Sequence, residues 1–272
     1  MDDKHAIESV KNPIVRRFRA AAGGDPPEHM VADGIKLVWE AMEAKLPIVE
    51  AAVSPRLHGT PLGKDVRRRL EREAGRVHEC SESVLERLSS LDTPQGVVAI
   101  LRRPAYQFDD LFGEGRAPLV AIAAGVKDPG NLGALARTAE AAAATGLVAI
   151  AGGADPFRDK AVRGSAGSIF RLPTLGPVAL ARVFDVVAAG RLQLVVADAD
   201  GDVDWFRADY TKPTAVVLGG EGGGVPEELL SQAAVRVRIP MATPVESLNV
   251  AVAAGIVLFE ARRQRLSAAD RG

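Results

Sequence analysis

The sequence contains very little cysteine and histidine. Its 272 residues include one cysteine, Cys80, and four histidines, and all five precede residue 106. A single cysteine forms no internal disulfide, which agrees with a reducing, cytoplasmic location. After residue 105, a serine–histidine–aspartate triad and a cysteine nucleophile are excluded, and no metal bound by histidine or thiolate is expected. Chemistry in that part of the chain must use carboxylates, amides, hydroxyls, arginine or a bound cofactor.

Long apolar runs and a strong charge imbalance are also missing. No stretch of about 18 apolar residues occurs, so we expect no membrane span. The first residues are acidic where a signal peptide would be basic and then apolar. The sequence contains no G-x-x-x-x-G-K-[ST] pattern, which excludes an ordinary P-loop nucleotidase. Its net charge of −1 provides no global basic field, so contacts with nucleic acid would depend on local clusters of arginine.

The apolar residues present are sufficient for a buried core, since 47% of the sequence is hydrophobic. A polar, turn-rich segment without periodicity at residues 106–117 predicts a linker. We therefore expect one domain at residues 1–105 and a second at residues 118–272. In the first domain, apolar spacing predicts helices at Ile35–Met42 and Val66–Ala74 and strands at Ile48–Val53 and Gly96–Leu101.

The second domain alternates between strand-like and helix-like segments. Strands are expected at Leu119–Ala123, Leu147–Ile150, Leu194–Asp198, Ala215–Leu218 and Val235–Ile239. Helices are expected at Leu132–Ala144, Ala179–Ala189, Pro226–Gln232 and Asn249–Gln264. This alternation is typical of an α/β fold with a mostly parallel sheet that helices cover on both faces.

Three segments of the second domain hold residue types suited to chemistry. In the first, Asn131 is placed to cap a helix, with Arg137 about one and a half turns further on. A helix N-terminus beside an arginine suits a phosphate or a ribose phosphate. An ordinary turn followed by a solvated arginine fits this segment equally well.

A glycine-rich loop is the second segment. An apolar strand ending at Leu218 leads into five glycines that surround Glu221. Glycine lets the backbone approach a ligand closely, and in open α/β sheets ligands bind at the carboxyl ends of strands. A central carboxylate favours a ligand with hydroxyl or amine groups over a bare phosphate. A flexible turn is the alternative interpretation.

The third segment begins where a strand ends at Ile239, because Pro240 and Pro244 prevent its continuation. Ser247 or Asn249 can cap the helix that follows. That helix is small and apolar on nearly all sides, so it should be buried, either in the core or at a subunit interface.

Together the three segments resemble the SpoU/TrmH family of RNA 2′-O-ribose methyltransferases, within the SPOUT superfamily. The matching motifs are N-x-G-x-x-x-R at Asn131–Arg137, R-x-S-A-G at Arg163–Gly167, L-G-G-E-G-x-G at Leu218–Gly224 and I-P-M…E-S-L-N-V-x-V-A at Ile239–Ala253. The first domain is more loosely similar, through Leu91–Val97, to the ribosomal-protein-like substrate-binding domain of rRNA-directed members. The resemblance implies a deep C-terminal trefoil knot and a homodimer formed through the knot region. Thr243 departs from the pattern, because many relatives have glycine there.

The resemblance also implies a reaction and the residues for it. A methyl group would pass from S-adenosyl-L-methionine to a ribose 2′-hydroxyl of RNA, with 23S rRNA as the expected substrate and no metal. The implied catalytic residues are Asn131, Arg137, Glu221, Ser247 and Asn249. The implied cofactor-binding residues are Leu218, Gly219, Gly220, Ile239, Met241 and Leu248. A guanidinium is hardly ever deprotonated, so for Arg137 we favour stabilising a developing alkoxide over accepting its proton.

Two clusters of arginine in the first domain predict contacts with RNA phosphates. Three of these side chains would share one helix face at i, i+4 and i+8 spacing, namely Arg68, Arg72 and Arg76. The second cluster consists of Arg16, Arg17 and Arg19. A solvated face paired with neighbouring glutamates is the alternative interpretation of the first cluster.

Two other functions stay open: methylation of tRNA, and RNA binding by a catalytically inactive homologue. The additional N-terminal domain favours structured rRNA over tRNA. The presence of Asn131, Arg137, Glu221 and Asn249 argues against an inactive protein.

Overall fold

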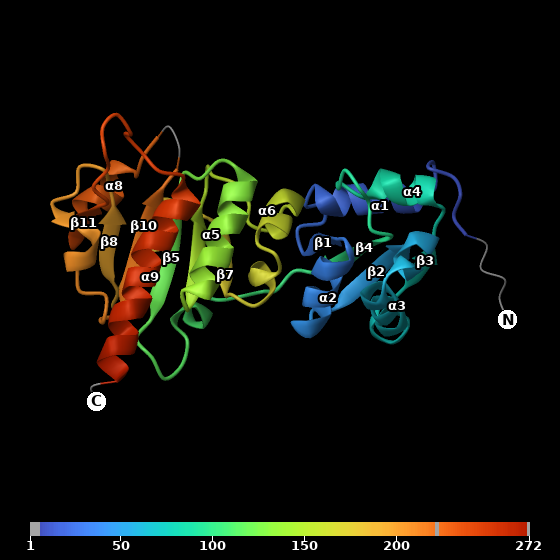
Figure 1. Cartoon of the computed structure of the whole chain (residues 1–272), viewed down its shortest axis with the longest axis horizontal. Helices are drawn as coiled ribbons and strands as arrows, with labels where there is room; N and C mark the ends of the chain where they lie inside the picture. Colours follow the sequence, from blue (N-terminus) through green and yellow to red (C-terminus); the bar gives the residue numbers. More distant parts are fainter. Residues whose placement is uncertain (1–5, 221–222, 271–272) are drawn as a thin grey trace. The chain divides into compact units, whose positions relative to one another are not determined.

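The computed structural model describes residues 6–220 and 223–270. The chain divides into two compact units (Figure 1). The first unit comprises Met1–Ala105 and Phe157–Phe170, and the second comprises Tyr106–Pro156 and Arg171–Gly272. A short helix within residues 157–170, which the sequence analysis did not predict, thus belongs to the first unit.

The first unit contains a four-stranded mixed sheet in the order β1-β4-β2-β3. β4 pairs antiparallel with β1 and β2, whereas β3 pairs parallel with β2. Helices α1 and α4 cover one face, where Phe18 and Leu85 pack against Val98 and Ile100. The strands are β1 (His29–Asp33), β2 (Ile48–Val53), β3 (Val77–Glu79) and β4 (Val97–Arg102). The helices are α1 (Pro13–Ala22), α2 (Ile35–Glu43), α3 (Pro61–Glu73), α4 (Glu82–Leu88) and α6 (Asp159–Gly164).

The second unit contains a seven-stranded sheet in the order β7-β6-β5-β10-β8-β11-β9. Its neighbouring strands pair in parallel, which confirms the predicted parallel α/β fold. The strands are β5 (Leu119–Ala124), β6 (Gly146–Ile150), β7 (Thr174–Val178), β8 (Gln193–Ala197), β9 (Val203–Asp204), β10 (Thr214–Gly219) and β11 (Val235–Arg238). The helices are α5 (Pro129–Ala141), α7 (Leu180–Ala189), α8 (Glu227–Ser231) and α9 (Val250–Ala269).

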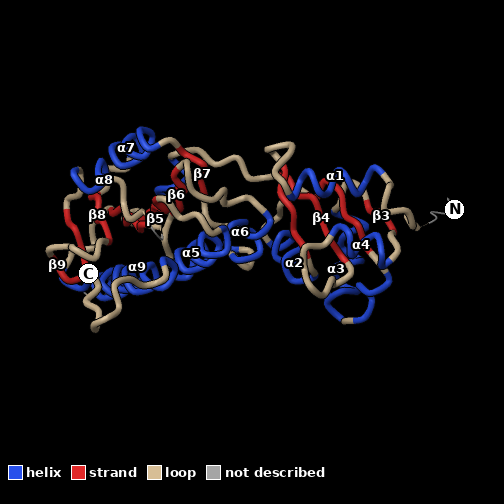
Figure 2. The backbone as a smooth tube through the Cα atoms, turned by 90° about the horizontal axis from the view of Figure 1, so that it is seen from above, coloured by secondary structure: helices blue, strands red, loops and turns tan. Residues whose placement is uncertain are grey.

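Helices cover both faces of this sheet, as Figure 2 shows. On one face, Val183 and Val186 of α7 and Leu229 of α8 join a buried cluster with Val120 and Ile122 of β5. On the other face, α5 and α9 lie side by side (Figures 1 and 2). Because the central strands are buried on both faces, they are continuous apolar runs instead of alternating ones.

The N-terminus of α5 differs from the sequence prediction. The helix begins at Pro129, and its N-cap is Asp128, whose side chain accepts a hydrogen bond from Asn131 N at 2.9 Å. The prediction that Asn131 caps this helix is therefore wrong, because an aspartate followed by proline provides an earlier start. Arg137 consequently lies more than two turns into the helix, not one and a half.

Candidate active site

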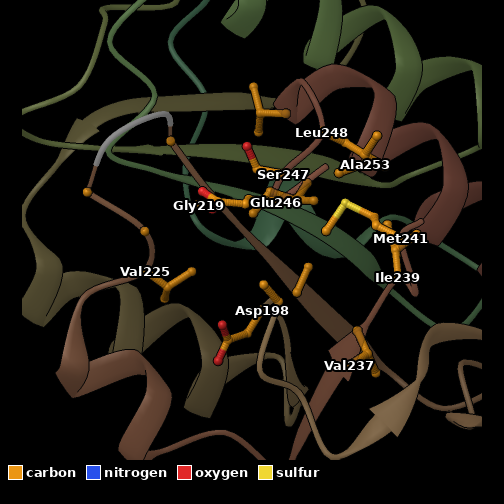
Figure 3. A pocket seen from close by; sticks show the side chains of 17 residues that line it. Asp198, Gly219, Val225, Val237, Ile239, Met241, Glu246, Ser247, Leu248 and Ala253 are labelled. Carbon is orange, nitrogen blue, oxygen red and sulfur yellow. The ribbon is translucent and has the colours of Figure 1, made fainter. Parts of the chain in front are cut away.

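A cavity of about 550 Å³ lies at the carboxyl ends of three neighbouring strands, β8, β10 and β11 (Figure 3). Parallel pairing aligns these ends, since Leu218 of β10 is level with Ala197 of β8, and Ala197 is also level with Val237 of β11. This edge of an open α/β sheet is the usual place for a ligand, and the volume suits a small organic molecule. The glycine-rich loop and the segment after Ile239 supply most of the walls: Leu218, Gly219, Gly220, Gly223, Gly224, Val225, Ile239, Met241, Glu246, Ser247, Leu248, Val250 and Ala253.

The glycine-rich loop is packed too closely for side chains at its first two positions. A Cβ atom on Gly220 would lie 2.0 Å from the carbonyl oxygen of Gly125, and one on Gly219 would lie 2.9 Å from the carbonyl carbon of Gly224. Gly220 N donates a hydrogen bond to Ala124 O at 2.7 Å, which fixes the start of the loop to β5. Glycine is thus required at both positions, because a side chain would collide with the neighbouring backbone. Glu221, the predicted catalytic carboxylate, lies outside the described residues.

The six predicted cofactor-binding residues all line this one cavity, together with Ser247. They come from two stretches of chain that are separated by α8 and β11. Leu218 is buried, whereas most of residues 240–249 are exposed and form an irregular wall. The structure therefore places these residues around a common space, and their role toward a cofactor stays a prediction.

Asn249 lies between two residues that line the cavity, Leu248 and Val250, and its side chain meets that of Asn131. Asn249 Nδ2 donates a hydrogen bond to Asn131 Oδ1 at 3.0 Å. Asn249 is also the N-cap of α9, because its Oδ1 accepts a hydrogen bond from Ala251 N at 2.9 Å. The cap assigns the oxygen of this amide, so the nitrogen is the atom that faces Asn131.

Arg137 extends from α5 into solvent. Its side chain is exposed and has no hydrogen bond or ion pair within the part of the chain that the structure describes. It is not among the residues that line the cavity. An exposed, unpaired guanidinium is available to bind an external anion.

The sequence analysis missed several cavity residues, above all Asp198 directly after β8. Arg236 of β11 donates to Asp198 Oδ2 through Nη2 at 2.6 Å and through Nε at 3.2 Å. This hydrogen bond raises the pKa of the Arg236 guanidinium. The position of Asp198 at the end of a predicted parallel strand was a usable signal, because strand ends form the ligand edge.

The arginine cluster expected on α3 is only partly on one face. The helix ends at Glu73, and Gly75 N donates to Ile48 O at 2.8 Å, so the chain leaves the helix to pair with β2. The prediction that Arg76 shares the helical face of Arg68 and Arg72 is therefore wrong. All three side chains are exposed, and Arg68 forms an ion pair with Asp65.

The second arginine cluster lies on α1. Arg16, Arg17 and Arg19 are exposed. Arg17 forms an ion pair with Glu50 at 2.8 Å, and Arg19 Nε donates to the carbonyl oxygen of Arg87 at 3.3 Å. The Arg16 side chain has neither an ion pair nor a hydrogen bond in the described part of the chain.

Comparison with known proteins identifies the family. The model of the SpoU rRNA Methylase family matches residues 118–259, which is more than half of the chain. The chain belongs to the SpoU rRNA methylase family. This confirms the resemblance inferred from the sequence motifs. A second model, the MRM3-like substrate binding domain, matches residues 15–99.

Several SpoU relatives are similar over much of this chain. An "uncharacterized tRNA/rRNA methyltransferase" of Synechocystis sp. is 35% identical and covers 99% of this chain and 98% of its own length. A 23S rRNA (uridine(2479)-2′-O)-methyltransferase of Streptomyces viridochromogenes is 38% identical over 65% of this chain and 63% of its own length. The solved structure of an AdoMet-bound rRNA methyltransferase from Sinorhizobium meliloti is 34% identical, covers 95% of this chain and 97% of that chain, and superposes with a TM-score of 0.82.

Two features are absent from the described residues. Among residues 6–220 and 223–270, no helix combines the length and apolar character needed to cross a membrane. Within the same residues, no group of three or more histidine, cysteine, aspartate or glutamate side chains is arranged to hold a metal ion.

Proposed function

We propose that this SpoU methylase transfers a methyl group from S-adenosyl-L-methionine to a ribose 2′-hydroxyl of 23S rRNA. The observation that supports this most strongly is the cavity at the carboxyl edge of the sheet, which the glycine-rich loop and the segment after Ile239 enclose. The Streptomyces and Sinorhizobium relatives are named as rRNA methyltransferases, and the structure of the second is bound to AdoMet. The substrate-binding domain matched at residues 15–99 favours rRNA over tRNA.

The cavity fits the cofactor chemically. Apolar side chains at Leu218, Ile239 and Met241 offer contacts for a flat aromatic base. Gly219 and Gly220 have no side chain, so they line the cavity with backbone atoms alone. The bound cofactor supplies a methyl group already activated by its sulfonium, so the reaction requires no metal. The protein then contributes mainly by positioning the acceptor in line with that methyl group.

The residues beside the cavity divide the remaining work. The hydrogen bond between Asn131 and Asn249 holds the N-terminal turns of α5 and α9 together, and we assign these amides and Ser247 to orienting the acceptor ribose. Glu221 is assigned to the same group on the sequence motif. Arg137 binds the neighbouring phosphate and stabilises negative charge that develops on the 2′-oxygen.

Substrate RNA is bound largely by the first unit. The exposed arginines of α3 and α1 contact phosphates, which position the RNA without reading its sequence. Arg16, Arg72 and Arg76 are the best candidates, because none of them has an ion-pair partner in the described residues.

The enzyme is a cytoplasmic homodimer that forms through a C-terminal knotted region. The support is an apolar stripe on α9, where Val252, Phe259 and Leu266 repeat every seven residues and are 52%, 47% and 55% exposed. Residues seven apart lie on nearly the same side of a helix. An exposed row of large apolar side chains is typical of an interaction surface.

The test is a methylation assay with the purified protein, radiolabelled cofactor, and 23S rRNA or tRNA transcripts. We expect label in 23S rRNA at one 2′-O-methylated nucleotide, located by mapping of alkali-resistant bonds. Label in tRNA instead would support the tRNA alternative. Absence of label on both RNAs, with binding of RNA retained, would support the inactive homologue.

A further inference from the structure

Asp198 lies in the cavity but has no part in the function proposed above. It directly follows β8, on the wall beside the glycine-rich loop of the neighbouring strand β10. In Figure 3 its carboxylate lies at the margin of the cavity, with Val225 and Val237 on either side. The side chain is 22% exposed. A carboxylate placed at the edge of a mostly apolar cavity is suited to orient a polar part of a ligand.

The two oxygens of this carboxylate have different partners. Oδ2 accepts hydrogen bonds from Arg236 Nη2 at 2.6 Å and from Arg236 Nε at 3.2 Å. Oδ1 accepts a longer hydrogen bond, of 3.3 Å, from Asp200 N. A carboxylate oxygen can accept two hydrogen bonds, so Oδ1 keeps acceptor capacity. The contact with Arg236 fixes the orientation of the group.

The ion pair with Arg236 determines which kind of hydrogen-bond donor Asp198 Oδ1 can bind. A carboxylate that is already neutralised attracts a second full cation weakly, but it remains a strong acceptor for neutral hydroxyl groups. In dinucleotide-binding sheets, an acidic residue near a glycine-rich loop hydrogen-bonds the hydroxyls of a ribose. From this geometry we infer that Asp198 Oδ1 accepts a hydrogen bond from the ribose 2′- or 3′-hydroxyl of the bound S-adenosyl ligand. This inference rests on the proposed function.

The test measures binding, not turnover, by titration calorimetry on the full chain. The variant is Asp198→Asn, which keeps the shape and an acceptor for Arg236. Its matched control is Asp202→Asn, which removes the same charge from the exposed part of the same loop. The ligands are S-adenosylhomocysteine, 5′-methylthioadenosine, which lacks the amino acid portion, and the 2′-deoxy and 3′-deoxy forms of S-adenosylhomocysteine. Thermal unfolding without ligand verifies that each variant folds.

We expect Asp198→Asn to raise the Kd for S-adenosylhomocysteine and for methylthioadenosine by about tenfold or more, the usual effect of a hydrogen bond to a charged group. For one of the two deoxy ligands, the Kd values of the variant and the wild type should differ by less than about threefold, because that ligand lacks the hydroxyl that Asp198 binds. Asp202→Asn should leave every Kd within about twofold of wild type, since exposed charges act weakly.

Three outcomes overturn the inference alone: an unchanged Kd in Asp198→Asn, an equal loss in Asp202→Asn, or a loss that persists with both deoxy ligands. A loss confined to ligands with the amino acid portion also overturns it, because Asp198 would then bind the ammonium group. A wild-type protein that binds none of the four ligands contradicts the proposed function itself.

Discussion

At the scale of single residues, Arg137 stands apart because many other arginines of the second unit form ion pairs and Arg137 does not. It is exposed on α5, outside the cavity, and without an ion-pair partner in the described residues. Its position outside the cavity agrees with the proposal that Arg137 acts on the RNA and not on the cofactor.

Arg137→Ala should lower methyl transfer by about 100-fold or more, the usual loss when one stabiliser of a developing oxyanion is removed. Cofactor affinity, measured by calorimetry, should stay near that of wild type. Arg137→Lys should restore little activity, because a point charge does not reproduce the planar guanidinium. Arg207→Ala, at another exposed arginine of the same unit, is the control and should retain activity. Normal turnover in Arg137→Ala would remove this residue from the mechanism.

Gly219 lies in the wall of the cavity, where a side chain does not fit. A Cβ atom there would lie 2.9 Å from Gly224 C and 3.0 Å from Val225 Cγ2. Gly219→Val should therefore displace the glycine-rich loop and abolish binding of S-adenosyl-L-methionine in calorimetry. Gly59→Val is the matched control, because Gly59 does not line the cavity and a Cβ there meets nothing within 4 Å. Wild-type affinity in Gly219→Val would show that the cofactor site lies elsewhere.

At the scale of elements, Gln264 and above all Arg265 connect the last turns of α9 to the rest of the second unit. Arg265 donates to the carbonyl oxygens of Tyr210 at 2.8 Å and of Pro118 and Lys212 at 2.9 Å, and also to that of Ala117. Burial lowers its pKa to about 10, so it is still charged at neutral pH.

Arg265→Ala should lower the free energy of unfolding by about 3 kcal/mol, because several carbonyl groups lose a charged donor. The measurement is urea unfolding followed by circular dichroism. Arg265→Lys should recover only part of the loss, since an ammonium group cannot reach all of these carbonyls in one geometry. Replacement of the exposed Arg263, whose ion pair is with Glu260, should cost less than about 1 kcal/mol. Equal losses at Arg263 and Arg265 would contradict the proposed anchoring role.

The exposed arginines on and just after α3 are expected to bind RNA. Replacing Arg68, Arg72 and Arg76 by glutamate should weaken RNA binding and flatten its dependence on salt by about one unit of slope for each lost phosphate contact. Cofactor affinity should not change. Three reversals on exposed arginines of the second unit, Arg182, Arg191 and Arg207, provide a control with the same change in net charge. An unchanged salt slope in the first variant would direct the search to α1.

For the whole molecule, the apolar stripe on α9 leads to a prediction about assembly. Phe259→Glu should shift the protein toward monomers in sedimentation velocity runs, because a buried, unpaired charge at an interface is costly. Leu62→Glu, at an exposed apolar residue of the first unit, should leave the sedimentation coefficient unchanged. A monomeric wild-type protein at the same concentrations would contradict the proposed homodimer.

The five inner strands of the second unit could be predicted well, because buried parallel strands are continuous apolar runs between glycine- or proline-containing turns. The two edge strands, β7 and β9, were missed. Helix ends were less predictable. α5 starts earlier than its apolar spacing suggests, since Asp128 and Pro129 cap it before the first apolar position. Helix α1 and strand β1 were missed in the first unit, where polar residues interrupt the apolar pattern.

By itself, then, the sequence determined the parallel α/β fold, the family and the two segments that line the cavity, because these depend on local periodicity and short motifs. The tertiary structure alone decided which distant side chains meet. Asn131 reaches Asn249 because α5 and α9 pack side by side. Asp198 reaches Arg236 because β8 and β11 are neighbours in the sheet. Such contacts follow from strand order and helix packing, and neither is encoded in the spacing of residues along the chain.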